Sequence, residues 1–133
     1  MFQLDSRLEA DCIFITDLKL CRVLLMNDAN YPWIILVPRQ ADKKEIIDLS
    51  PEDQQLLTQE SSFISHAMQK LFNPNKLNIA ALGNIVSQLH IHHIARFTTD
   101  AAWPNPVWGK VSRKEYEITH LENLITRLKN QIN

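Results

Sequence analysis

Gln88, His90 and His92 follow one another at two-residue spacing near the middle of the chain. Side chains on an extended strand alternate between its two faces, so these three are expected on one face and His93 on the other. A neutral imidazole carries one lone pair and one N–H, which suits a nucleophile, a proton carrier or a metal ligand near neutral pH. The histidines alone leave two interpretations open: a reactive site, or a partly buried polar strand satisfied by hydrogen bonds.

Five segments rich in apolar and β-branched residues predict the strands that must position these side chains. They are residues 12–16, 20–26, 33–37, 77–82 and 89–97. Residues 33–37 are apolar throughout and are followed by Pro38, so they predict a short strand buried on both faces at the centre of the sheet. Gly83, one of only two glycines, follows the fourth strand and is expected to hold a backbone shape that a side chain would forbid.

Two helices are predicted. Ser50 is a suitable N-cap, Pro51 suits the first helical position, and the apolar residues that follow keep helical spacing until Asn73 and Pro74. A second amphipathic helix is expected from Ser112 to the C-terminus. Because strands and helices do not alternate regularly, the sequence predicts an α+β domain with an antiparallel sheet.

The 133-residue chain has the size of one domain, with residues 1–111 as its body and the helix of 112–133 as part of the same unit. The net charge of −1 gives no general attraction to nucleic acid or to an anionic membrane, so we expect a small-molecule partner. Cys12 and Cys21 lack a CxxC spacing and are expected to be reduced core residues. No signal-peptide pattern or membrane-length apolar run occurs, which predicts a cytoplasmic location.

The segment from Gly83 to Arg96 resembles, without a gap, the signature of the histidine triad (HIT) family, usually Gly-Gln-x-Val-x-His-x-His-x-His, two apolar residues, Pro and Arg. Residues 24–38 are similar to the family's asparagine- or aspartate-bearing strand and the buried strand after it, so the resemblance covers roughly residues 12–109. It implies an antiparallel sheet of about five strands with one helix packed on it and a C-terminal helix. Within the family, the chain resembles bacterial diadenosine-polyphosphate-hydrolase-like members.

In this register Gln88 takes the first triad position, His90 the middle one and His92 the last. The resemblance implies that His90 attacks the α-phosphorus of a nucleotide and forms a nucleotidyl-histidine intermediate that water then hydrolyses. A backbone carbonyl of the same segment would hold the Nδ1–H of His90, and His92 would donate to a non-bridging phosphate oxygen. The scheme requires no metal and no other cofactor.

The resemblance also suggests residues that bind the rest of a nucleotide. Backbone N–H groups around Gly83 and Asn84 would form an anion cradle. Asn27 would hydrogen-bond the ribose hydroxyls, or it is simply a turn residue at a strand end. Trp103 and Trp108 either anchor their proline-containing loop or narrow the leaving-group pocket.

The chain departs from the family pattern at two informative positions. Gln88 replaces a histidine, which removes a titratable group but leaves a hydrogen-bonding side chain. Trp33 stands where many members have a histidine after a glycine, so the hydrogen bond of that histidine must be absent or differently made. A shifted register with His92 as the nucleophile misplaces Gly83 and Arg96, and we disfavour it.

Three functions remain in competition. The first is a HIT-type nucleotide hydrolase or transferase acting on a dinucleoside polyphosphate or a nucleoside phosphoramidate. The second is a metal-dependent hydrolase with His90 and His92 as ligands, for which no third protein ligand is evident. The third is a non-catalytic nucleotide-binding module, signalled by Gln88 and opposed by the retained His90. The resemblance further implies a homodimer with a sheet continuing across its interface.

Overall fold

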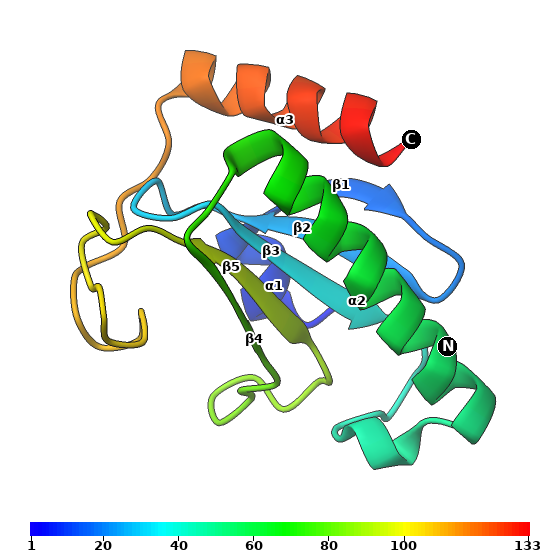
Figure 1. The fold of residues 1–133 in the computed structure, drawn as a ribbon. Helices are drawn as coiled ribbons and strands as arrows, with labels where there is room; N and C mark the ends of the chain where they lie inside the picture. Colours follow the sequence, from blue (N-terminus) through cyan, green and yellow to red (C-terminus); the bar gives the residue numbers. More distant parts are fainter.

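A five-stranded antiparallel sheet forms the centre of the computed structural model, which describes residues 1–133 (Figure 1). Its spatial order is β1 (Cys12–Asp17), β2 (Cys21–Met26), β3 (Trp33–Pro38), β5 (Ile91–Arg96) and β4 (Lys76–Ala80). Every neighbouring pair runs antiparallel. The α+β class is therefore confirmed, and all six residues of β3 are buried in the middle of the sheet as predicted.

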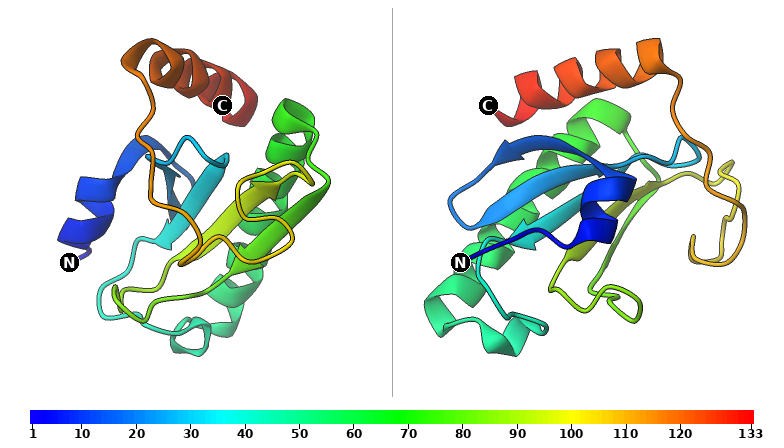
Figure 2. Two further views of the ribbon diagram at one scale, coloured as in Figure 1. Left: turned by 90° about the vertical axis from the view of Figure 1, so that its left-hand side faces the viewer. Right: turned by 180° about the vertical axis from the view of Figure 1, so that it is seen from behind.

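Two long helices cover one face of the sheet, and a short N-terminal helix lies on the other (Figures 1 and 2). The long helices are α2 (Pro51–Phe72) and α3 (Ile118–Ile132), the short one is α1 (Ser6–Asp11), and a single 3₁₀ turn, η1 (Ile46–Asp48), precedes α2. The Ser50 side chain accepts from the Asp53 N–H at 3.1 Å, and Asn73 ends α2 in the left-handed region with φ 48°. Both limits follow from the local sequence.

Each face of the sheet has its own apolar core. Beneath α2 and α3, residues of the sheet pack against Leu57, Ile64 and Met68 of α2 and against Leu124 and Leu128 of α3. On the other face the core consists of side chains from α1, the sheet and the loop after β5, namely Leu8, Leu24, Tyr31, Trp33, Ile35, Val37, Ile94, Ala102 and Val107. Two separate cores keep the sheet rigid between them.

Alternation along β5 assigns its side chains to these two faces. Ile91 and Ala95 belong to the core under the helices, whereas Ile94 belongs to the core beside α1. His93, which is completely buried, contacts Ser61 of α2 through Nε2 at 2.7 Å, and His92 lies on the opposite face. The predicted separation of His92 from His93 is confirmed.

Two elements begin later than the sequence-based expectation, and one helix was not expected. β5 begins at Ile91 rather than at residue 89, because the N–H of Leu89 donates to the carbonyl of Lys43 at 2.8 Å instead of joining the sheet. α3 begins at Ile118 rather than at residue 112, because residues 112–116 are hydrogen-bonded to the turn that follows β2, with the N–H of Tyr116 donating to Asn27 Oδ1. α1 was not predicted at all.

Both cysteines are free, with Cys21 buried and Cys12 half-buried. None of the helices combines the length and the apolar character that crossing a bilayer requires.

Candidate active site

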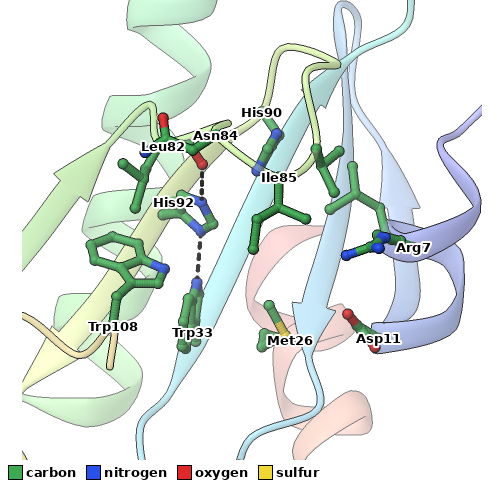
Figure 3. Close-up of a pocket in the computed structure, with 12 residues that line it drawn as sticks. Arg7, Asp11, Met26, Trp33, Leu82, Asn84, Ile85, His90, His92 and Trp108 are labelled. Atoms are coloured by element: carbon green, nitrogen blue, oxygen red, sulfur yellow. Dashed lines mark hydrogen bonds between the residues drawn. The ribbon is translucent and has the colours of Figure 1, made fainter. Parts of the chain in front are cut away.

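A cavity of about 420 Å³ opens on the face of the sheet that α2 and α3 leave uncovered (Figure 3). Its wall is assembled from α1, from the ends of β2 and β3, from the loop before β5, from β5 itself and from the loop after it. His90 and His92 both line it, with ring centroids 4.8 Å apart. The structure thus brings together the two histidines that the spacing singled out.

His90 is held in one tautomer by the main chain. Its Nδ1 lies 2.6 Å from the carbonyl oxygen of Gln88, which can only accept, so the proton resides on Nδ1. This bond confirms the expectation of a backbone acceptor on the same segment. Nε2 makes no hydrogen bond and keeps its lone pair beside the cavity, although only 5% of the residue is exposed. A buried imidazole that is oriented through Nδ1, with Nε2 facing a cavity, has the geometry needed for nucleophilic attack.

His92 is held in the opposite tautomer by Trp33. The indole N–H of Trp33 donates to Nδ1 of His92 at 3.0 Å, so the proton of His92 must reside on Nε2. That Nε2–H points at the carbonyl of Leu82, 3.3 Å away. Both contacts are drawn in Figure 3. At the position where many family members have a histidine, this chain thus supplies an indole donor from the central strand to His92.

Burial keeps His92 neutral. Desolvation, followed by the proximity of His90, lowers the pKa of His92 from 6.5 to about 4. Above pH 5 the ring is therefore a neutral Nε2–H donor beside the cavity.

Trp108 belongs to the cavity wall and Trp103 does not. The Trp108 ring meets His92 edge to face at 5.1 Å and Trp33 at 5.8 Å between centroids. Trp103 instead covers the guanidinium of Arg96 at 5.7 Å, outside the cavity. Trp103 thus packs against Arg96 within its own loop, whereas Trp108 lines the cavity.

Arg96 and Asp100 fix the loop that carries both tryptophans. The pair is almost completely buried, with Arg96 Nε 2.8 Å from Asp100 Oδ2. The Asp100 carboxylate also accepts the backbone N–H groups of Phe97, Ala102 and Trp103, and these bonds with that of Arg96 lower its pKa to about 2 against the effect of burial. A loop tied to a charged pair in this way presents Trp108 at a fixed place.

The loop from Gly83 to Gln88 carries unpaired backbone donors. None of its N–H groups donates a hydrogen bond elsewhere in the chain. Gly83 is required by space, not by a positive φ: a Cβ there would lie 2.6 Å from the carbonyl oxygen of Val86. Asn84 lines the main cavity, and Gly83 lines a smaller neighbouring cavity of about 180 Å³ that also borders His90. Free N–H groups beside a nucleophile are the elements of an anion cradle.

Two predicted site residues have partners away from the main cavity. Asn27 Oδ1 accepts the backbone N–H of Tyr116 at 3.0 Å, so this side chain holds the segment before α3 and does not line the cavity. The Gln88 carboxamide also lies outside the main cavity and is bonded to the N-terminal segment. β5 starts after Gln88, so simple strand alternation does not extend to it.

Sequence reasoning missed the contribution of α1. Its residues Arg7, Leu8 and Asp11 line the cavity, as do Met26 and Ile85. Asp11 is also paired with Arg113 at 2.9 Å. The one available signal was Asp5, whose carboxylate accepts the N–H of Arg7 as an N-cap.

No group of three or more His, Cys, Asp or Glu side chains is arranged to hold a metal ion. His90 and His92 consequently have no third protein ligand of these types beside them.

Comparison with known proteins supports the resemblance noted in the sequence. The family model described as the HIT domain matches residues 7–99. A histidine triad protein of Bradyrhizobium japonicum superposes with a TM-score of 0.97 at 50% identity, covering 99% of this chain and 98% of that one. For a histidine triad protein of Marinobacter aquaeolei VT8 the values are 0.96 and 48%, with 99% and 96% covered.

The Plasmodium falciparum diadenosine triphosphate hydrolase, solved with Cyclomarin A, gives a TM-score of 0.68 at 23% identity and covers 100% of this chain and 81% of that one. This likeness concerns the fold alone. No curated protein matches the sequence.

Proposed function

The chain belongs to the histidine triad (HIT) family, which supports an activity of the nucleotide hydrolase or transferase type, and we propose that it cleaves nucleotides at the α-phosphate through a covalent intermediate on His90. The observation that carries this proposal is the 2.6 Å bond from His90 Nδ1 to the carbonyl of Gln88. It fixes the ring with the lone pair of Nε2 beside the cavity, where an attacking atom must be.

The reaction would proceed in two displacements. First, Nε2 of His90 forms a bond to the α-phosphorus, and the bond from phosphorus to the leaving group breaks. Water then attacks the same phosphorus and gives up a proton to solvent, while the P–N bond breaks, its electron pair returns to Nε2 of His90, and the nucleoside monophosphate is released. Each step exchanges one bond at phosphorus, so a difficult displacement is replaced by two easier ones.

The surroundings of His90 would stabilise the phosphoryl group. The Nε2–H of His92, which faces the Leu82 carbonyl at 3.3 Å in this structure, would donate to a non-bridging phosphate oxygen when substrate is bound. The unpaired N–H groups of Gly83 and Asn84 would add further donors. Such preformed donors act most strongly where water is excluded, as beside these two buried histidines.

The apolar part of the cavity would hold the nucleoside. Met26, Ile85 and Val86 line it together with Leu8 of α1, while Trp108 would border the leaving group. A volume of about 420 Å³ lies in the range usual for small-molecule sites. We therefore propose dinucleoside polyphosphates and nucleoside phosphoramidates as the substrate classes.

The resemblance to the family further leads us to propose a homodimer as the active form. Light scattering would measure the molar mass in solution and check this.

Rapid mixing with an α-³²P-labelled nucleotide tests the mechanism. The quenched protein should carry label that is lost in acid and kept in base, as expected for a phosphoramidate of histidine. His90→Asn should carry no label and lose turnover by several orders of magnitude, on the order of 10³-fold or more. His66→Asn, at an exposed histidine on α2, serves as the matched control.

Two outcomes would overturn the proposal. If His90→Asn turned over substrate at a near-normal rate while His92→Asn lost activity, the nucleophile would be His92 and not His90. Nucleotide binding without any turnover by the unmodified protein would indicate a binding module.

A further inference from the structure

The carboxamide of Gln88 makes two hydrogen bonds to the backbone of the N-terminal segment, residues 1–5. Its Nε2 donates to the carbonyl of Gln3 at 2.9 Å, and its Oε1 accepts the N–H of Asp5 at 2.9 Å. In an extended chain the carbonyl of one residue and the N–H of the second residue after it point to the same side. The amide therefore pairs with two backbone groups at once, and both of its polar atoms are occupied.

This segment leads directly into the part of the cavity wall that belongs to α1. Asp5 is the N-cap of α1, and Arg7, Leu8 and Asp11 of that helix line the cavity. Phe2 and Leu4 pack against the core on the same face, and Leu8 is buried in it. A displacement of residues 1–5 would therefore also displace α1 and the side chains with which it lines the cavity.

The main chain and the side chain of Gln88 have different partners: the main chain contacts His90, and the side chain contacts the N-terminal segment. The carbonyl oxygen of Gln88 accepts from His90 Nδ1 at 2.6 Å. One residue thus joins the orientation of the imidazole to the docking of the N-terminal segment, although Gln88 and Gln3 are 85 residues apart in the sequence.

We propose that Gln88 is a positioning residue, which holds residues 1–5 and α1 as the nucleoside side of the cavity and transfers no proton in the reaction. The inference rests on the proposed function for its choice of substrate. An imidazole also has one donor and one acceptor, but these point from opposite sides of a ring and cannot pair with two neighbouring groups of one extended segment. The glutamine at the first triad position is therefore matched to the N-terminal segment of this chain.

A split between binding and turnover tests the proposal. Gln88→Ala should raise KM for an adenosine 5′-phosphoramidate roughly tenfold, as expected for two lost hydrogen bonds, and leave kcat within about twofold. With the corresponding ribose 5-phosphoramidate, which has no base to meet the α1 wall, KM should not change. A fall in kcat with KM unchanged, growing as the leaving group becomes more basic, would instead assign proton transfer to Gln88 and overturn the proposal.

The backbone partner of Gln88 offers a second test with a matched control. Asp5 has φ −55°, which proline accepts, so Asp5→Pro deletes the N–H that donates to Gln88. Asp5→Ala keeps this N–H and removes only the side-chain cap on Arg7. The KM of Asp5→Pro should exceed that of Asp5→Ala. In the double variant Asp5→Pro/Gln88→Ala, the fold-increase in KM should be smaller than the product of the fold-increases in the two single variants, because both remove the same hydrogen bond.

Hydrogen exchange followed by mass spectrometry separates this inference from the proposed function, because it needs no turnover. Amides of residues 1–11 should exchange faster in Gln88→Ala and in Asp5→Pro than in the unmodified protein and in Asp5→Ala, with the exchange of β3 unchanged. Unaltered exchange of residues 1–11 in both variants would overturn the positioning role, whatever the assays of His90→Asn show. If the unmodified protein showed no turnover but the variants still exchanged residues 1–11 faster as described, the proposed function would be wrong and the positioning role of Gln88 would stand.

Discussion

The indole N–H of Trp33 donates a 3.0 Å hydrogen bond to Nδ1 of His92, with the two rings edge to face at an interplanar angle of 60°. A protonated His92 would turn an N–H toward the indole N–H, so this contact opposes protonation as well as fixing the tautomer. Trp33 begins the central strand and His92 lies on its neighbour β5. The chemistry of the histidine is thus set by the pairing of two buried strands.

Trp33→Phe should release His92 from its single tautomer. We expect kcat to fall roughly tenfold, as for other residues that orient a functional histidine, and the pKa of His92 to rise from its lowered value. Steady-state kinetics and ¹⁵N NMR of the imidazole nitrogens would measure both. Trp108→Phe is the control, because Trp108 contacts the same ring without a hydrogen bond. Equal effects of the two variants would show that ring packing, and not the indole N–H, is what matters.

Gly83→Ala should lower turnover by displacing the loop of unpaired N–H groups. The new Cβ would lie 2.6 Å from the Val86 carbonyl, so the backbone must shift. Gly109→Ala is the comparison: it has open space but a φ of 76°, so it should cost about 1 kcal/mol of unfolding free energy and leave kcat largely intact. Urea denaturation and kinetics of both variants decide the point. Unchanged kcat in Gly83→Ala would argue against a role for this loop.

Folding stability should fall as the pH drops from about 6.5 to about 4. Burial lowers the pKa of both His92 and His93 from 6.5 to about 4, so the unfolded chain binds protons in this range that the folded protein does not. The stability is complete above about pH 6.5, and each histidine removes about 3 kcal/mol by pH 4. Urea titrations across this range measure the slope.

Replacing His93 tests the origin of this pH dependence. His93→Gln keeps a hydrogen-bonding side chain toward Ser61 and should reduce the slope by about half. His66→Asn, at an exposed position on α2, should leave it unchanged. An identical slope in His93→Gln would attribute the acid sensitivity to other groups.

Turnover should survive strong chelators. The proposed site stabilises the phosphoryl group with N–H donors and imidazole, and no set of three metal-binding side chains is present beside them. Dialysis against EDTA followed by assay with a phosphoramidate, which binds Mg²⁺ weakly in solution, measures this. Loss of activity that stoichiometric zinc restores would favour the metal-dependent alternative.

Trp103 and Trp108 should respond differently to replacement by alanine. Trp108→Ala removes a cavity wall and should change the preference among leaving groups with a small change in stability, since 36% of the residue is exposed. Trp103→Ala uncovers the buried Arg96 and should lower the unfolding free energy by about 1 to 2 kcal/mol, with substrate preference kept. Thermal denaturation and a series of leaving groups distinguish the two.

Local sequence patterns were sufficient for most of the fold. The five strands appear within about two residues of their predicted limits, because their apolar runs and flanking turn residues are local properties. Ser50, Pro51 and Asn73 set the limits of α2 for the same reason. α1 escaped prediction because its six residues bury only Leu8 and so produce no periodicity.

The partners of the site residues were harder to predict because they are distant in sequence. Asn27 bonds a backbone N–H 89 residues away, and Gln88 bonds one 83 residues away. Trp33 and His92 meet only through the register of β3 with β5, across 59 residues. The residue types at these positions indicated polar contacts, but only the assembled sheet determines with which groups.

Because His92 and His93 are adjacent on β5, the register of β5 against β3 decides which of the two histidines faces the cavity. In the observed register Ile35 faces His92 and Ile34 faces His93 across the β3–β5 pair. A slip of β5 by one residue would exchange the faces of the two histidines, bringing His93 to Trp33 and burying His92 beneath α2. Such a molecule would keep a similar secondary-structure content and circular dichroism spectrum. Specific activity, more than any spectroscopic measure of folding, would then report the fraction of chains in the native register.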